Sequence, residues 1–151
     1  MKRTVQILVV DDEPAIRESY KLLLQHVGHA VEMADGGAAA LALLAQRKFD
    51  VVITDFSMPG MQGDELVARI RQRLPAQRII MATAFAHEFR VFGQTDGHVD
   101  ALLLKPFSFK DLCEAIQQVL IQEPPVESGD LPPLNQPSPP PVPNPLRFPK
   151  G

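Results

Sequence analysis

The sequence predicts an α/β fold in which a doubly wound parallel sheet of five strands, in the order 2-1-3-4-5, lies between two layers of helices. Short runs rich in β-branched residues alternate with longer segments whose apolar residues recur every three or four positions. The connections between these segments are tight, which favours parallel pairing with helices on both faces. The chain has 151 residues and is 45% apolar, as expected of one domain with a full core.

The first strand and helix are predicted from residues 5–10 and 14–27. Branched apolar residues dominate the first segment, and two aspartates end it. Apolar residues recur at three- and four-residue steps in the second segment, namely Ile16, Tyr20, Leu23, Leu24 and Val27. Pro14 suits the first position of a helix, and Gly28 suits a stop. We therefore expect a strand followed directly by a helix in this part of the chain.

A second strand and helix are expected at residues 30–34 and 38–46. The turn Asp35-Gly36-Gly37 separates them, and alanine and leucine dominate the helix. This pair extends the alternating pattern.

The third strand, residues 51–54, is a short run of β-favouring residues that leads into Asp55 and then into a Pro59-Gly60 turn. A third helix is expected at residues 62–74, before Pro75. Its inward-facing residues are expected to be Leu66, Val67 and Ile70. Asp55 is therefore predicted at the carboxyl end of a buried strand, where open α/β sheets carry their sites.

The last part of the domain contains predicted strands at residues 78–83 and 101–104. Between them, residues 87–94 predict a short, weak helix, because aromatic and β-branched residues and a glycine lower its propensity. A final helix is expected to start at Ser108, with Asp111 completing a reciprocal cap, and to run to about residue 122.

Composition changes at residue 124. Eleven of the fifteen prolines lie between Pro124 and Pro149, with almost no periodic apolar pattern. We therefore expect one domain over residues 1–123 and a proline-rich, extended or disordered tail over residues 124–151. Within the tail, residues 137–143 favour the polyproline II conformation.

Charge and cysteine content exclude several functions. The net charge of −3 shows no basic excess, so neither nucleic acid nor an anionic membrane is an expected partner, and no DNA-binding output module is expected. A single cysteine excludes an internal disulfide or a multi-cysteine metal site. The sequence has no signal-peptide pattern and no apolar run long enough to span a bilayer, so we expect a cytoplasmic protein. We also expect a monomer or weak dimer.

Polar residues of chosen types follow four of the predicted strands. Asp11 and Asp12 follow the first strand, Asp55 the third, Thr83 ends the fourth, and Lys105 follows the fifth. In a sheet of order 2-1-3-4-5 the first and third strands are neighbours, so three carboxylates meet. They repel one another by roughly 1 kcal/mol per pair even in water, so such a cluster predicts a bound cation that offsets the repulsion.

Oxygen ligands favour Mg²⁺ as that cation. The predicted ligands are Asp11, Asp12, Asp55 and the backbone carbonyl of Ser57, which leave room for a phosphoryl oxygen. A carboxylate such as Asp55 can act as a nucleophile and become an aspartyl phosphate. Lys105 supplies an ammonium to balance the phosphoryl charge.

These motifs resemble the receiver domain of bacterial two-component response regulators. The likeness spans about residues 4–123, and its spacings are 43 residues from Asp12 to Asp55, 28 to Thr83 and 22 to Lys105. The resemblance also rests on the motifs Met58-Pro59-Gly60, Met81-Ala82-Thr83-Ala84 and Lys105-Pro106-Phe107.

The resemblance implies a flavodoxin-like fold and a phosphoacceptor signalling role. It implies that Asp55 receives a phosphoryl group from a histidine kinase or phosphotransfer protein, that Asp12 and Asp55 hold Mg²⁺ with Asp11 acting through water, and that Thr83 and Lys105 bind the phosphoryl oxygens. A downstream protein target is also implied, whereas catalysis is limited to the domain's own phosphorylation and dephosphorylation.

Leu102 departs from the family pattern. The position three before the lysine is normally tyrosine or phenylalanine, whose ring moves inward with the threonine, and leucine has no ring. We therefore expect retained phosphorylation with an altered output.

Two alternatives stay open. One is a pseudo-receiver that acts as a phosphorylation-independent interaction module. The other is a phosphohydrolase on the same sheet, although that does not explain Asp55 and Lys105 together. A nucleotide-binding site is disfavoured because the first turn has no glycine-rich phosphate loop.

Overall fold

The computed structural model describes residues 4–84 and 99–121 and contains a five-stranded parallel sheet. Its order is β2-β1-β3-β4-β5, as the sequence predicts. The strands are β1 (Gln6–Val10), β2 (Ala30–Ala34), β3 (Val51–Asp55), β4 (Arg78–Thr83) and β5 (Ala101–Leu104).

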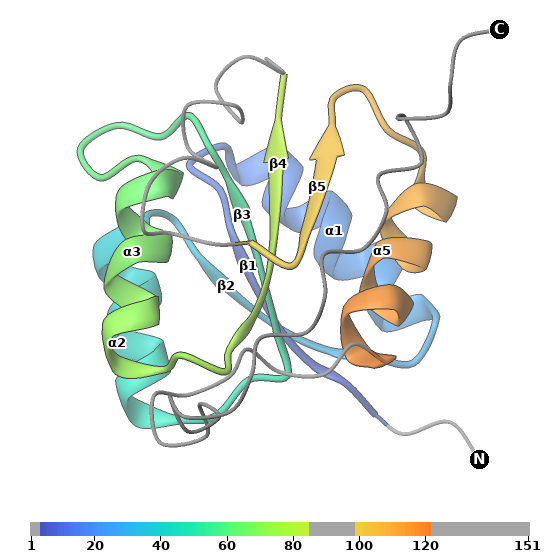
Figure 1. Ribbon diagram of the computed structural model, residues 1–151. Coiled ribbons are helices and arrows are strands. Elements are labelled where there is room, and N and C mark those ends of the chain that lie inside the picture. The colour runs from blue at the N-terminus through green and yellow to red at the C-terminus, as the bar shows by residue number, and fades with distance from the viewer. Residues whose placement is uncertain (1–3, 85–98, 122–151) are drawn as a thin grey trace, which may run out of the picture.

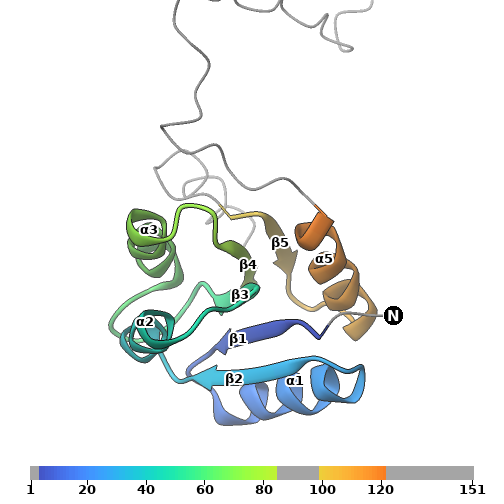
Figure 2. The same ribbon diagram turned by 90° about the horizontal axis from the view of Figure 1, so that it is seen from below.

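Helices cover both faces of the sheet (Figure 1). Those described are α1 (Pro14–His26), α2 (Gly37–Gln46), α3 (Gly63–Arg73) and α5 (Phe109–Ile121). Figure 2 shows α2 and α3 on one side of the sheet and α1 and α5 on the other, which is the expected three-layer arrangement. The helix predicted at residues 87–94 and the tail predicted at 124–151 lie outside the described residues, and the domain boundary stays a prediction.

Two apolar cores lie on opposite faces of the sheet. Leu8, Val10 and Val52 contribute to the core under α2 and α3, while Ile7 and Val9 contribute to the core under α1 and α5. Because both faces are covered, the buried middle residues of the central strands are apolar, as in Val51, Val52 and Ile53 of β3. The inward face predicted for α3 is confirmed: Leu66, Val67 and Ile70 are buried.

Helix α1 buries a narrower face than its sequence pattern indicates. Leu24 is fully buried, but Leu23, one residue earlier and about 100° around the helix, is 42% exposed. Val27 is also 42% exposed and lies beyond the helix as its carboxyl cap. Gly28 follows with φ +99°, so the predicted glycine stop is confirmed.

Helix α5 begins with the predicted reciprocal cap. The Asp111 backbone N–H donates to Ser108 Oγ at 3.0 Å, and the Ser108 backbone N–H donates to Asp111 Oδ2 at 3.0 Å. These bonds satisfy two backbone donors at the amino-terminal end of the helix, and hydrogen bonds from the backbone and side chain of Ser108 lower the pKa of Asp111. In the described part of the chain no helix is both long and apolar enough to cross a bilayer.

Candidate functional site

Strand register brings the predicted site residues to one edge of the sheet. Val10 pairs with Thr54, Asp55 with Ala82, and Thr83 with Leu104, so β1, β3, β4 and β5 end together at the upper edge in Figure 1. Asp55 is the last residue of β3, whereas the sequence predicts a strand ending one residue earlier. Its backbone is therefore held by the sheet, which fixes the position of its carboxylate.

The three carboxylates predicted to meet do so. One ligand atom from each of Asp11, Asp12 and Asp55 lies within 4.8 Å of the others. Asp11 is 2% exposed, and the Asp55 side chain is 12% exposed. Water screens the mutual repulsion of such charges less than it does at an open surface.

Asp11 has a raised pKa in this cluster. Burial raises its pKa above the usual 3.8, and the charges of Asp55 and Asp12 raise it further. The opposing effects are a hydrogen bond at 2.9 Å from the Glu13 backbone N–H to Asp11 Oδ1, and the nearby charge of Lys105. The site therefore favours a positive charge beyond the one the lysine supplies.

Lys105 reaches the cluster directly. Its Nζ lies 3.1 Å from Asp55 Oδ1, and its side chain is 30% exposed. The Lys105 backbone N–H donates to the Thr83 carbonyl at 2.8 Å, which ties the end of β5 to the end of β4. Thr83 itself is buried, at the predicted place.

Gly63 is a site residue that sequence reasoning missed. It is the first residue of α3, and its N–H donates to the Phe56 carbonyl at 2.8 Å. A Cβ here would lie 2.4 Å from the Asp55 carbonyl oxygen and 2.8 Å from Phe56 Cα. Only glycine lets α3 approach the end of β3 this closely, and the glycine at a helix start was the available signal.

A second missed feature is a stacked pair of rings beside the site. Tyr20 of α1 and Phe107, two residues past Lys105, have ring centroids 6.2 Å apart and planes inclined by 20°. Burial raises the pKa of Tyr20 to about 12, with further effects from Asp11 and Asp55. The sequence indicated Tyr20 only as part of an apolar helix face.

Two predicted residues lie at the site or its margin without a described contact to the carboxylates. Ser57 is exposed in the loop after β3, two residues past Asp55, and its carbonyl ligand role stays a prediction. Leu102 pairs with Met81 and packs against the core under α2 and α3. Its proposed effect on output also stays a prediction.

The ligand set fits a hard divalent cation. Three carboxylates within 4.8 Å offer only oxygen ligands, and one of them has a raised pKa because it is buried near negative charge. Mg²⁺ prefers oxygen ligands, binds through few carboxylates and retains waters. Asp11, Asp12 and Asp55 are thus the residues able to hold it.

Comparison with known proteins agrees with this geometry. A family model described as the response regulator receiver domain matches residues 7–117. Chemotaxis protein CheY-3 of Vibrio cholerae is 34% identical over 122 residues, which cover 79% of this chain and 94% of the relative. Response regulator MprA of a Mycobacterium strain is 35% identical over 130 residues, covering 86% of this chain but 56% of the relative.

Solved structures give the same result. CheY4 of Vibrio cholerae superposes with a TM-score of 0.73 at 35% identity, covering 78% of this chain and 100% of that one. TrrA of Thermotoga maritima, a response regulator in complex with Mg²⁺ and BeF, superposes with a TM-score of 0.70 at 36% identity and the same coverage. By sequence, by fold and by the carboxylates at the sheet edge, this chain belongs to the response regulator receiver domain family.

Proposed function

We propose that this chain is a phosphoacceptor switch in which Asp55 receives a phosphoryl group in a Mg²⁺-dependent reaction. Receivers of this family are signalling domains that interact with histidine kinases and downstream proteins. The observation that carries the proposal is the place of the Asp55 carboxylate, within 4.8 Å of Asp11 and Asp12 and 3.1 Å from Lys105 Nζ.

The chemistry follows from these positions. A carboxylate oxygen of Asp55 attacks the phosphorus atom of a phosphohistidine on a kinase or phosphotransfer protein. The new P–O bond forms as the P–N bond breaks, and the bonding electron pair leaves with the imidazole nitrogen. An attacking carboxylate has no proton to lose, so the step requires no base, and Lys105 Nζ lies 3.1 Å from the Asp55 carboxylate.

Other residues in the site stabilise the charge that develops. Lys105 pairs with the phosphoryl oxygens, and Thr83 offers its hydroxyl to them. Asp11, Asp12, Asp55 and the Ser57 carbonyl would hold Mg²⁺, which would supply positive charge to neutralise the transferred group. The complex of TrrA with Mg²⁺ and BeF supports this assignment, because that protein is similar in sequence and fold.

The test is incubation with acetyl phosphate and Mg²⁺, followed by intact mass. We expect one phosphoryl adduct, which Asp55→Asn and a metal chelator each abolish. Asp35→Asn is the matched control, because Asp35 follows β2 at the same edge of the sheet and is not in the carboxylate cluster. An adduct that persists in Asp55→Asn would refute the assignment of the phosphoacceptor.

The same experiment separates the alternatives. Turnover of the phosphate donor without a stable adduct would indicate a phosphohydrolase. No adduct in the native chain would indicate a phosphorylation-independent interaction module. Lys105→Ala is expected to slow adduct formation strongly while leaving the circular dichroism spectrum of the chain unchanged.

We further propose that Leu102 changes how phosphorylation is reported. It lies on β5, where it pairs with Met81 and packs against the core under α2 and α3, and its side chain lacks the ring of the family pattern. Amide exchange over residues 85–98 with and without a phosphate mimic tests this, in the native chain and in Leu102→Tyr. A smaller change in exchange is expected for the native chain, and equal changes in both would refute it.

A further inference from the structure

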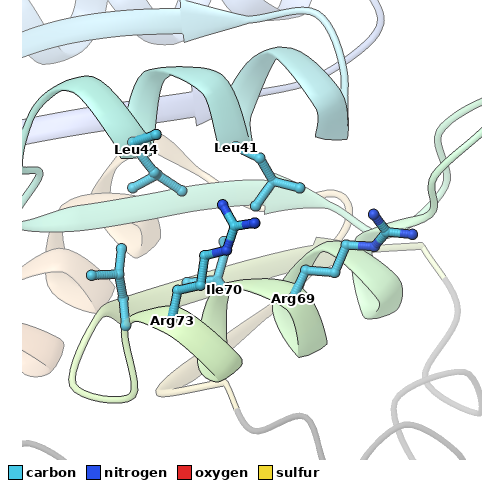
Figure 3. Close-up of a pocket in the computed structure, with 7 residues that line it drawn as sticks. Leu41, Leu44, Arg69, Ile70 and Arg73 are labelled. Atoms are coloured by element: carbon cyan, nitrogen blue, oxygen red, sulfur yellow. The ribbon is translucent and has the colours of Figure 1, made fainter.

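A groove runs between α2 and α3, on the face of the sheet opposite α1 and α5 (Figure 3). Its volume is about 170 Å³. In Figure 3 leucines extend from α2 toward α3, and arginines extend from α3 along the opposite wall. The principal lining residues are Leu41, Leu44, Ile70, Leu74, Arg69 and Arg73. The groove is therefore apolar at its floor and basic at its rim.

The groove continues to the lower edge of the sheet. A neighbouring hollow shares Leu44, Arg73 and Leu74 with it and extends past Arg47 and Lys48. Helix α2 has no charged residue, and the charged residues that line the groove and the hollow are all basic. The path is suited to a segment that carries both carboxylates and apolar side chains.

Two of the arginines have acidic partners that can be exchanged. Arg69 pairs with Glu65 at 2.9 Å, and Arg47 pairs with Glu32 at 2.8 Å. All four side chains are between 44% and 53% exposed, and surface pairs of this kind contribute about 1 kcal/mol or less. They do not prevent an incoming carboxylate from binding.

The chain leaves the described domain close to this hollow. Arg78, at the start of β4, donates a hydrogen bond from Nε to the Val119 carbonyl in the last turn of α5. The preceding residue, Gln77, lines the hollow. Figure 1 shows the ends of α3 and α5 at the same lower edge of the sheet. The residues that follow Ile121 therefore start near the hollow that Gln77 lines, on the α5 side of the sheet, and must cross to the other face to reach the groove.

The sequence that follows is complementary to the groove. Residues 122–136 contain three acidic residues, no basic ones, and apolar residues at three positions. The acidic residues are Glu123, Glu127 and Asp130, and the apolar ones are Val126, Leu131 and Leu134. Four prolines in this stretch favour an extended chain that is ready to lie in a groove.

Its length also matches. An extended proline-rich chain rises about 3.1 Å per residue, so Glu127 and Asp130 can lie roughly 19 and 28 Å from Ile121. Crossing from the α5 layer to the α3 layer requires about 20 Å, two layer spacings of roughly 10 Å each. A tethered segment with this reach has an effective concentration in the millimolar range, far above that of a free partner.

We propose that residues 122–136 dock in cis into the groove between α2 and α3. Glu127 and Asp130 pair with Arg73 and Arg69, and Leu131 covers the apolar floor. This places an intramolecular contact on a face separate from the carboxylate site and does not depend on the phosphoacceptor role of Asp55.

Disulfide trapping in the full chain tests the proposal. Ser128→Cys lies between the two acidic residues, and Ala45→Cys lines the groove, while Cys113→Ser removes the native thiol. We expect an intramolecular disulfide to form in a thiol redox buffer. The rate of its formation should be independent of protein concentration. Circular dichroism of the reduced chain checks the fold of each variant.

Charge reversal then tests the pairing. Arg69→Glu with Arg73→Glu is expected to slow disulfide formation about tenfold, as is Glu127→Lys with Asp130→Lys, and the two reversals together are expected to restore the rate. The matched control is Lys21→Glu with Lys110→Glu, which changes the net charge equally away from the groove and leaves the rate within about twofold. The tail reversals alter no residue of the described domain, so they remain informative if the arginine variants fail to fold.

Three results would overturn the proposal. The first is a disulfide rate unaffected by either reversal, which indicates an undocked tether. The second is a disulfide that forms only between chains, which indicates that the groove receives the tail of a second copy. The third is a rate that falls equally in the Lys21 and Lys110 control, which indicates an effect of net charge alone.

Discussion

Gly63→Ala tests whether the close approach of α3 to the end of β3 requires a glycine. The added Cβ would lie 2.4 Å from the Asp55 carbonyl oxygen, 2.8 Å from Phe56 Cα and 3.1 Å from Asp55 C. All three are backbone atoms of the strand end that presents the carboxylate. Because carbon and oxygen normally approach to about 3.3 Å, the start of α3 must retreat by roughly 1 Å.

The magnitude follows from two opposing effects. Replacing glycine by alanine in a helix stabilises it by about 0.5–1 kcal/mol, whereas overpacking a rigid contact costs about 1–3 kcal/mol. The net expectation is a loss of about 1–2 kcal/mol in the free energy of unfolding. A displacement of about 1 Å at a reacting group can also slow chemistry up to roughly a hundredfold, so phosphorylation of Asp55 should slow as well.

Gly37→Ala is the matched control. Gly37 is the first residue of α2, and its added Cβ would meet the Met61 side chain, with Sδ at 2.4 Å. A methionine side chain can change rotamer, so the stability change should stay within about 1 kcal/mol. Urea unfolding measures both variants, and acetyl phosphate labelling measures Asp55. Equal or greater stability of Gly63→Ala than of Gly37→Ala would refute the close-approach argument.

Three further predictions concern charge. Because burial and its acidic neighbours raise the pKa of Asp11, the folded chain binds this proton more tightly than the unfolded chain, and stability falls as pH rises from 3.8 through the folded pKa. Asp11→Asn should therefore raise the free energy of unfolding by about 1 kcal/mol at neutral pH without divalent cations. The increase should be smaller in acid or with Mg²⁺, and an increase that is the same under all three conditions would contradict the argument. Tyr20 is the single tyrosine, so its ultraviolet absorbance should report its titration, with a pKa of about 12 that shifts toward 10 in Asp11→Asn. Because the pKa is raised in the folded chain, stability should fall as pH rises above 10. Titration near 10 in the native chain would be inconsistent with the burial of Tyr20. Asp100→Ala should lower the free energy of unfolding by about 3 kcal/mol, because it removes the carboxylate that pairs with the buried Arg71 at 3.1 Å and accepts the Ile79 backbone N–H. Arg69→Ala should lower it by less than about 1 kcal/mol, and similar urea midpoints for the two variants would argue against the burial effect.

The sequence predicted the position of Asp55 and the start of α5 because the signals for both are local. A strand ending in an acid, followed by a Pro-Gly turn, placed Asp55 at a sheet edge from residues adjacent to it. The reciprocal cap of Ser108 and Asp111 spans only three residues, and both of its hydrogen bonds are present. Local conformational preferences such as these require no knowledge of what lies across the fold.

Predictions were weaker where packing decides the outcome. The periodic apolar residues of α1 indicated a continuous inward face, but Leu23 is largely exposed because the helix buries only the side nearest the sheet. The Tyr20–Phe107 stack joins residues 87 positions apart, and no periodic pattern predicts such a pairing. The same is true of Arg71 and Asp100, whose carboxylate also accepts the Ile79 backbone N–H at 2.7 Å.

By itself, the sequence determined the alternation of strands and helices and the identity of the polar residues at four strand ends, because hydrophobic period and turn chemistry depend on residues close together in the chain. The tertiary structure decided how closely those residues meet. The separation of 3.1 Å between Lys105 and Asp55 and the approach of Gly63 to the end of β3 depend on register and helix placement. Both are set by the packing of elements distant in sequence, which a linear pattern does not encode.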